Sequence, residues 1–379
     1  CCVRIQFRKV LRNGWAISRM SYAPKGWCQY NNNQGLKIIL VALIYGPSRM
    51  EQIAAIIRAR RSIDEALIWT WWRMHFEKHP KPSASRVENQ RFRAIILISA
   101  YGNNPYFAFQ IVSIAAQMTS DDLLVVADDG SRQVDWTPFL NANINYCIWT
   151  RLERLGSTRS YLDFLCNLDL KAKFYFLADQ DDVWLPGKIS TQIEACTSKD
   201  EASIAFCLHG WINFKENREI KKSDQKTPIP ELSKAHYCFE TPAPGMTLCI
   251  TAKGRDILIS KKAISDAFQK YLPHDRIICA LLASSANLVI CTKPLIRYRQ
   301  HDNNQIGAPE SNIIREWLRR LRGFDRMIQS VSHATYLSYK LNRLSGQSEL
   351  SYKIQLLRSR LRSSWIDNIL VKILILAGV

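Results

Sequence analysis

Two clusters of acidic residues, each directly after an apolar run, have the chemistry to bind a divalent cation together with a diphosphate. Their carboxylates are those of Asp128, Asp129, Asp179, Asp181 and Asp182. Five such groups in one cleft would repel one another strongly unless a cation offset their charge. A hard divalent ion bridges carboxylate and diphosphate oxygens. The two clusters together therefore predict a metal-assisted reaction on a substrate with a diphosphate leaving group, whereas one acidic turn alone more often caps a helix or forms a turn.

The apolar runs before these clusters have the length and composition of buried β-strands. Such runs occupy residues 94–99, 123–127, 173–178 and 203–208, and the segments between them include stretches with helical spacing. Strands that alternate with helices predict an α/β fold with a mostly parallel sheet and helices on both faces. Because ligands collect at the carboxyl ends of the strands in such a sheet, we expect both acidic clusters to converge on one crevice.

The net charge of +19 lies almost entirely in the two ends of the chain. Lys and Arg outnumber Asp and Glu by 15 to 5 in residues 1–90 and by 12 to 4 in residues 311–379, but only by 25 to 24 in residues 91–310. Such an excess indicates an anionic partner, either nucleic acid or an anionic membrane surface. The predicted chemistry lies in the balanced middle, and no nucleic-acid-binding module is recognisable. The distribution therefore favours peripheral membrane contact and no nucleic acid.

The same distribution divides the chain into three parts. Residues 1–90 are rich in Arg and Trp and are expected to be helical, either at a membrane interface or packed on the core. Residues 91–310 form the predicted catalytic domain, and residues 311–379 have the pattern of basic amphipathic helices. The 11 Cys form no C-x-x-C pair, which favours reduced, buried thiols in a cytosolic protein. No apolar run reaches the ~20 residues of a transmembrane helix. A start at Cys instead of Met is what we expect of a fragment.

Short motifs between residues 92 and 310 resemble, in the expected order, those of the family-2 glycosyltransferases with the GT-A fold, and within them the bacterial rhamnosyltransferase-type branch. The motifs are Ile98-Ser-Ala-Tyr101, Ser113-Ile-Ala-Ala-Gln117, Asp128-Asp-Gly-Ser131, Asp179-Gln-Asp-Asp-Val-Trp184 with Lys188, Pro244-Gly-Met-Thr247, His274-Asp275, and Tyr298-Arg-Gln-His301 with Asn304 and Gly307. Any one of them alone would be a weak signal. Their order along the chain makes the resemblance specific, and it implies a GT-A-type sheet between the two basic helical flanks.

The resemblance implies roles for the acidic residues. Asp128 or Asp129 would hold the base or ribose of a nucleotide sugar, and Asp179 would lie near the ribose. Asp181 would bind Mg²⁺ or Mn²⁺ together with the diphosphate, and Asp182 could share either task. These roles agree with the chemistry, because glycosyl transfer needs a stabilised leaving diphosphate and a metal supplies it as a Lewis acid.

The resemblance places the general base of the reaction at Asp275, where it would take the proton from the acceptor hydroxyl. Arg299 and His301 would approach the diphosphate or the metal as their loop closes. One in-line displacement would invert the anomeric centre without an enzyme nucleophile. From the residues alone, His274 and Asp275 could merely begin the helix that follows, because a carboxylate stabilises the first turn of a helix.

Three positions depart from the family pattern. Gly102 stands where the family usually has Asn, Arg154 replaces the Asn of an Asn-x-Gly segment, and His209 lies where related chains often carry an acidic residue. These departures concern how the nucleotide or the acceptor is held, and they leave the metal and base candidates in place.

We therefore expect an inverting, metal-dependent hexosyltransferase that acts on a saccharide or lipid-linked acceptor of a growing surface polysaccharide. The resemblance points to dTDP-rhamnose as the first donor to test. The basic flanks would hold the enzyme at the inner face of the cytoplasmic membrane, at ~1 kcal/mol per suitably placed Lys or Arg. Two alternatives stay open: a transferase of a different hexose, and a catalytically degenerate member that scaffolds a membrane-associated complex.

Overall fold

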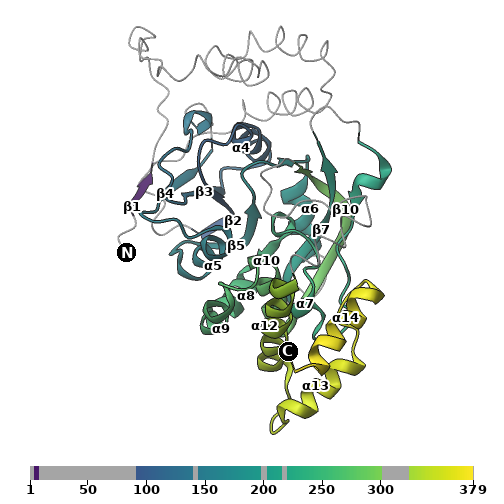
Figure 1. Ribbon diagram of the computed structural model, residues 1–379. Coiled ribbons are helices and arrows are strands. Elements are labelled where there is room, and N and C mark those ends of the chain that lie inside the picture. The colour runs from purple at the N-terminus through teal and green to yellow at the C-terminus, as the bar shows by residue number, and fades with distance from the viewer. Residues whose placement is uncertain are drawn as a thin grey trace, which may run out of the picture.

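The computed structural model describes residues 4–7, 91–139, 144–197, 203–215, 220–300 and 324–378. Its strands are β1 (Arg4–Phe7), β2 (Arg91–Ala100), β3 (Asp122–Asp128), β4 (Tyr146–Thr150), β5 (Lys171–Ala178), β6 (Val183–Trp184), β7 (Ile204–Phe214), β8 (Gln225–Lys226), β9 (Cys249–Thr251) and β10 (Asn287–Arg299). In this part of the chain they form one ten-stranded sheet in the order β1-β4-β3-β2-β5-β9-β7-β10-β6, with β8 paired to β7 (Figure 1).

The first half of the sheet is parallel, as the alternation of apolar runs and helical segments predicts. The strands β4, β3, β2 and β5 all run in the same direction. In the register of the central strand β2, Ala100 lies opposite Asp128 of β3, and Ile98 lies opposite Ala178 of β5. The carboxyl ends of β3 and β5 therefore flank the end of β2 at one edge of the sheet.

The second half of the sheet is mixed. The short strand β9 runs antiparallel to both of its neighbours, β5 and β7, whereas β10 runs parallel to β7 and antiparallel to β6. The sequence pattern predicts neither β9 nor β10. Three residues are too few for β9 to show a period, and the polar residues of β10 interrupt its apolar pattern.

Helices cover both faces of this sheet (Figure 1). The α-helices are α4 (Phe107–Ala115), α5 (Ser157–Asn167), α6 (Lys188–Thr197), α7 (His236–Phe239), α8 (Ala252–Ser260), α9 (Lys262–Phe268), α10 (His274–Ala283), α12 (Phe324–Asn342), α13 (Glu349–Arg358) and α14 (Trp365–Leu376). Short 3₁₀ turns lie at Thr137–Phe139, Lys222–Asp224 and Gly245–Thr247. None of the described helices has the length and apolarity needed to cross a membrane.

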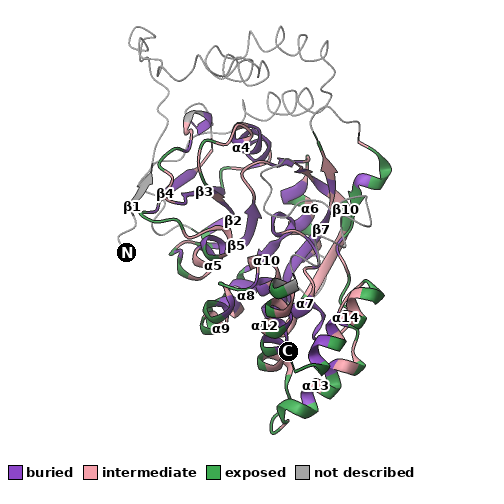
Figure 2. Cartoon of the chain, viewed as in Figure 1, coloured by how far each residue is buried: buried purple, intermediate pink, exposed green. Residues whose placement is uncertain are grey.

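The core has two layers, because successive side chains of a strand point to opposite faces. On β2, Ile95 and Leu97 belong to the apolar cluster beneath α5, α8 and α10, whereas Ile96 and Ile98 belong to the cluster beneath α4 and α6. Both clusters are fully buried at β2 (Figure 2). The α/β class and the helices on both faces are therefore confirmed.

The C-terminal helices α12, α13 and α14 extend one of these layers. α12 packs against α7, α9 and α14, and its Val331 and Leu337 belong to the same apolar cluster as α10. The predicted helical character of residues 311–379 can be followed from Phe324 onward. In the basic N-terminal part, the structure describes only β1, which pairs antiparallel with β4, so the helices predicted for residues 1–90 lie outside the described residues.

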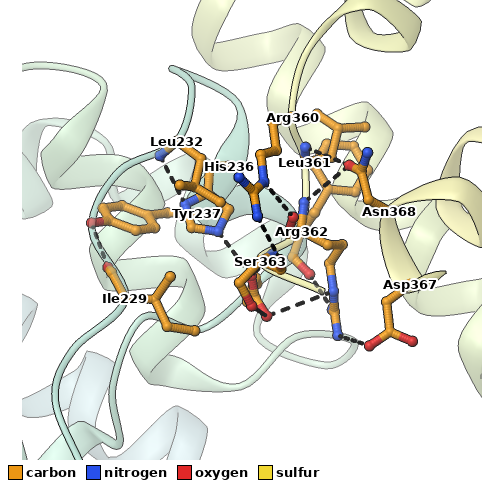
Figure 3. A network of polar contacts seen from close by, with 12 residues as sticks. Ile229, Leu232, His236, Tyr237, Arg360, Leu361, Arg362, Ser363, Asp367 and Asn368 are labelled. Carbon is orange, nitrogen blue, oxygen red and sulfur yellow. Dashed lines mark hydrogen bonds and ion pairs between the residues drawn. The ribbon is translucent and has the colours of Figure 1, made fainter. Parts of the chain in front are cut away.

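A polar network joins the segment before α14 to α7 (Figure 3). The Glu240 carboxylate accepts hydrogen bonds from His236 Nε2 at 2.9 Å and from the backbone N–H and hydroxyl of Ser363 at 2.6 and 2.8 Å. Arg362 lies 3.9 Å from the same carboxylate and donates to the carbonyl of Phe239 at 2.7 Å. Burial alone would raise the pKa of Glu240, but these donors and the Arg362 charge outweigh it and lower the pKa to about 2.

We expect Glu240→Gln to lower the free energy of unfolding by about 2 kcal/mol at pH 7. The difference between a pKa of 4.5 and one of about 2 corresponds to ~3.5 kcal/mol at ~1.4 kcal/mol per pKa unit, and solvent screening of this partly exposed carboxylate reduces that value. The folded pKa is depressed below the unfolded value, so this stabilisation is fully present above about pH 4.5 and is lost as the pH falls through about 2. Urea unfolding at pH 7 and at about pH 3 should show that the difference in unfolding free energy between wild type and variant is smaller at the lower pH. Glu349→Gln, at an exposed pair with Lys353, is the matched control and should change little. If the difference in unfolding free energy stayed constant with pH, the lowered pKa of Glu240 would be contradicted.

Candidate active site

The turn after β5 lies against the end of β2. The side-chain oxygen of Gln180 accepts a hydrogen bond from the backbone N–H of Tyr101 at 2.9 Å. The Tyr161 hydroxyl of α5 donates to the carbonyl of Ala178 at 2.6 Å and lies 3.3 Å from Asp179 Oδ1. These contacts hold the backbone of the second acidic cluster at the edge where the parallel strands end.

Four of the predicted site carboxylates lie close enough to act on one another electrostatically. They are those of Asp179, Asp181, Asp182 and Asp275. Burial, then repulsion by Asp181 and to a smaller extent by Asp275, raises the pKa of Asp179 to about 7, although the hydrogen bond from Tyr161 opposes the shift. Burial and the charges of Asp181 and Asp179 raise the pKa of Asp182 well above its usual range. The fold thus brings carboxylates from the turn after β5 and from the start of α10 into one cluster.

Tyr298 of β10 lies within electrostatic reach of this acidic cluster. Burial and then the negative charges of the four carboxylates raise the pKa of its hydroxyl above the usual value. The neutral phenol is therefore the stable form at the site, and it is available as a hydrogen-bond donor. The motif that contains Tyr298 was noted in the sequence, but no role was predicted for this residue.

Arg299 holds the acidic turn through its backbone and its side chain. Its backbone N–H donates to Asp182 Oδ1 at 3.0 Å, and its Nε donates to the carbonyl of Asp181 at 2.8 Å. The guanidinium carbon lies 4.1 Å from the ring centroid of Tyr106 and 4.6 Å from that of Phe214. Arg299 therefore lies at the predicted site and positions the turn 179–182. The contact with a diphosphate that the resemblance implies for Arg299 stays a prediction.

Asp275 is in the first turn of α10, where the helix dipole favours a negative charge. Its Oδ1 accepts the backbone N–H of Arg276 at 2.8 Å. The neighbouring His274 ring packs against the Tyr161 ring with centroids 4.6 Å apart. A side chain at Gly245 would collide with the His274 ring, which gives the glycine of the Pro244–Thr247 motif a steric reason. The fold therefore fixes the start of α10 from two sides.

Asp128, the last residue of β3, and Asp129, the first residue after it, are buried, and both carboxylates accept backbone hydrogen bonds. Asp128 accepts the backbone N–H groups of Ser131 and Arg132, each at 2.9 Å, and the Ser131 hydroxyl at 2.7 Å. Asp129 accepts the N–H groups of Leu155 and Gly156 at 3.0 and 2.8 Å, and so ties the loop before α5 to the end of β3. Both residues lie at the same sheet edge as Asp179. Contact with a nucleotide stays a prediction for them.

The residues of the turn 179–182 fit a divalent cation. Asp182 Oδ2 is buried and receives no hydrogen bond from the residues in the described ranges, and the carboxylate of Asp181 lies partly buried next to it in the chain. Hard cations prefer such carboxylate oxygens. The described residues include no group of three His, Cys, Asp or Glu able to hold an ion by itself, so the substrate would have to supply further ligands. His301, the third predicted metal ligand, lies outside the described residues.

Helix α4 and the residues directly after it position the segment after the acidic turn. The Ser113 hydroxyl accepts the backbone N–H of Trp184 at 3.0 Å, and the Gln117 side chain accepts the backbone N–H of Lys188 at 2.8 Å. The motif Ser113-Ile-Ala-Ala-Gln117 therefore supports the site by holding the backbone of the segment that follows the acidic turn. The family resemblance includes this motif but does not imply these hydrogen bonds.

Lys188 and His209 form a buried pair that sequence analysis did not predict. Lys188 Nζ lies 2.7 Å from His209 Nε2 and donates to the side-chain oxygen of Gln192 at 2.8 Å. His209 Nδ1 lies 2.6 Å from the carbonyl of Gly210 and must carry the proton, which leaves Nε2 to accept from the lysine. Burial lowers the pKa of Lys188 to about 7, and the charge of Asp182 opposes this shift. The sequence feature that could have pointed to this pair is His209 itself, which stands where related chains often carry an acidic residue.

Comparisons with known proteins give distant similarities, and no family model matches the chain. Over 227 residues the chain is 23% identical to the dTDP-rhamnosyl transferase RfbG of Shigella flexneri, a match that covers 56% of this chain and 74% of that protein. The S. aureus TarS 1–349 structure in complex with UDP-GlcNAc is 14% identical, with a TM-score of 0.45, over 76% of this chain and 92% of that chain. The mannosyltransferase PcManGT from Pyrobaculum calidifontis in complex with GDP-Man and Mn²⁺ is 13% identical, with a TM-score of 0.43, over 90% and 85%.

Proposed function

We propose that this protein is a glycosyltransferase that moves a sugar from a nucleotide-diphosphate donor to an acceptor hydroxyl. The observation that carries the proposal is the meeting of Asp179, Asp181, Asp182 and Asp275 at the edge where the parallel strands end. The similarity to a dTDP-rhamnosyl transferase supports the same reaction class and makes rhamnose the first sugar to test.

The donor would bind with its diphosphate at the turn 179–182. Asp181 and Asp182 would hold Mg²⁺ or Mn²⁺, which when bound supplies Lewis-acid stabilisation of the leaving diphosphate. The buried Asp182 Oδ2 accepts no hydrogen bond from the described residues, so a bound cation would supply its partner and favour the charged carboxylate, and Arg299 keeps the turn in place through two hydrogen bonds. The chain itself thus contributes a pre-positioned turn of carboxyl groups, and positioning is a large part of such catalysis.

Asp275 would act as the general base on the acceptor hydroxyl. A base must lie within hydrogen-bond reach of the proton it takes, and Asp275 is the one cluster carboxylate that belongs to a separate element, α10. It can therefore face the acceptor while the turn after β5 holds the donor. Direct attack of the activated hydroxyl would invert the anomeric carbon. The acceptor in this proposal is a saccharide or a lipid-linked saccharide of a surface polysaccharide, at the inner face of the cytoplasmic membrane.

The experiment that tests the function is a screen of nucleotide sugars, with dTDP-rhamnose first, for thermal stabilisation with and without Mn²⁺. A donor at ~100 times its Kd stabilises the folded state by about 2.7 kcal/mol, which raises Tm by several degrees. We expect this shift with at least one donor, its loss on chelation of the metal, and transfer to an acceptor by that donor. A degenerate scaffold would show no metal-dependent shift with any of them, and that result would reject the proposal.

A further inference from the structure

The last helix of the described chain exposes a continuous apolar row. The side chains of the row are 46–70% exposed and belong to Trp365, Ile366, Ile369, Ile373 and Leu376. At 3.6 residues per turn, all five fall within an arc of about 100° around α14. The opposite side of the helix is buried through Val371, Leu374 and Ile375. Figure 2 shows exposed segments along α14 at the end of the molecule away from β1. α14 is therefore apolar on both sides, and only one side packs against the protein.

The C-terminal segment that contains this row is cationic. Between Phe324 and Gly378 the chain has eight Lys or Arg and three Asp or Glu. Two of the three acids are already paired, Glu349 with Lys353 at 3.4 Å and Asp367 with Arg362 at 3.8 Å. Arg358 and Arg360, just before the helix, are exposed and form no ion pair with the described residues. A segment with this net charge attracts an anionic surface.

The start of α14 is held firmly, so the row has a defined orientation. Ser364 caps the helix by accepting the backbone N–H of Asp367, and the side-chain oxygen of Asn368 accepts the backbone N–H groups of Leu361 and Arg362 at 2.8 and 3.2 Å. The two hydrogen bonds from Ser363 to the Glu240 carboxylate attach the same segment to the end of α7 (Figure 3). The exposed row is therefore a fixed feature of the folded surface.

The size of the row fits a lipid interface better than a second protein. A 12-residue helix is ~18 Å long and ~10 Å wide, so its outer face covers roughly 200 Å². A stable protein interface buries roughly 800 Å² on each partner. An interfacial helix needs only an apolar face that enters the boundary between headgroups and acyl chains, a Trp at its edge and nearby cations. α14 has all three.

We propose that α14 docks this protein on a membrane surface that contains anionic lipids. The row from Trp365 to Leu376 enters the interface, and the exposed Arg358 and Arg360 contact lipid phosphates. The helix lies in the plane of the membrane and does not cross it, in keeping with its length. This docking does not depend on the proposed reaction, and it would place whatever substrate the site uses at the membrane surface.

The test is flotation of the full chain with phosphatidylcholine vesicles that do or do not contain phosphatidylglycerol. We expect wild type to float with the mixed vesicles, and the double variant Ile369→Glu/Ile373→Glu to lose at least about tenfold in binding. Ile259→Glu, at an apolar residue of α8 that is also exposed, is the control and should bind like wild type. Circular dichroism and Tm of both variants check that the fold is retained.

Three results would overturn the proposal. In the first, wild type does not float with the mixed vesicles. In the second, the double variant binds like wild type, so another surface of the protein binds the membrane. In the third result, sedimentation velocity would show that wild type is a dimer that the double variant breaks, with unchanged vesicle binding. The row would then be an interface between two copies of the chain.

Discussion

Replacing Asp275 by Asn should lower kcat by about 10²–10⁴-fold and leave donor binding nearly unchanged, because general-base catalysis contributes a factor of this size. Asn keeps the shape of the side chain and an oxygen that can accept the backbone N–H of Arg276, so the first turn of α10 should remain intact. The variant loses only the ability to take a proton. The measurements are initial rates of sugar transfer at saturating donor and acceptor, and donor binding by metal-dependent thermal shift.

A loss of kcat with unchanged donor binding distinguishes a general base at Asp275 from a structural residue. A merely structural Asp275 would lower Tm and weaken donor binding together with kcat. Asp266→Asn is the matched control, since Asp266 is an exposed carboxylate of α9 that pairs with Lys262. If Asp275→Asn kept a tenth or more of the wild-type kcat, the proton would be taken by another group, and the assignment of Asp275 as base would be wrong.

Replacing Asp181 by Ala should abolish the metal-dependent part of donor binding and reduce turnover by at least about a hundredfold. The backbone of this residue already has a structural task, because its carbonyl accepts Arg299 Nε at 2.8 Å, and Ala preserves that carbonyl. The substitution therefore removes the carboxylate and leaves the turn 179–182 held in place. Isothermal titration of the donor with Mn²⁺ and with chelator measures the effect directly.

The control for this variant is Asp256→Ala, which removes an exposed carboxylate of α8 outside the acidic cluster. Its donor affinity should match that of wild type in both conditions. An Asp181→Ala protein that still binds donor more tightly with Mn²⁺ than without it would show that the metal does not need the Asp181 carboxylate. Because Asp182 would remain in that variant, Asp181→Ala/Asp182→Asn would then test the whole turn.

Much of the site could be predicted because its parts are local in sequence. The apolar runs before Asp128 and Asp179 are strands β3 and β5, and parallel neighbours must end at the same edge. A run of buried residues followed by acidic ones is visible without knowledge of any partner. The family resemblance added Asp275, whose residue type and position alone are equally consistent with the start of a helix.

The tasks of individual side chains could not be predicted in the same way. Asp128 and Asp129 accept backbone N–H groups from residues 131–132 and 155–156, and the second contact spans more than 25 residues of chain. Lys188 and His209 come into contact because α6 packs against β7. The apolar row on α14 is the exposed side of that helix because the opposite side packs against α12.

The sequence by itself determined the α/β class, the parallel strands that end in carboxylates, and the concentration of positive charge at the two ends of the chain. Period and composition set these features residue by residue, so no distant contact is needed to establish them. Only the tertiary structure decided which carboxylates act on one another, where β9 enters the sheet antiparallel, and which side of α14 stays open. Each of these depends on segments far apart in the chain, whose packing no local pattern encodes.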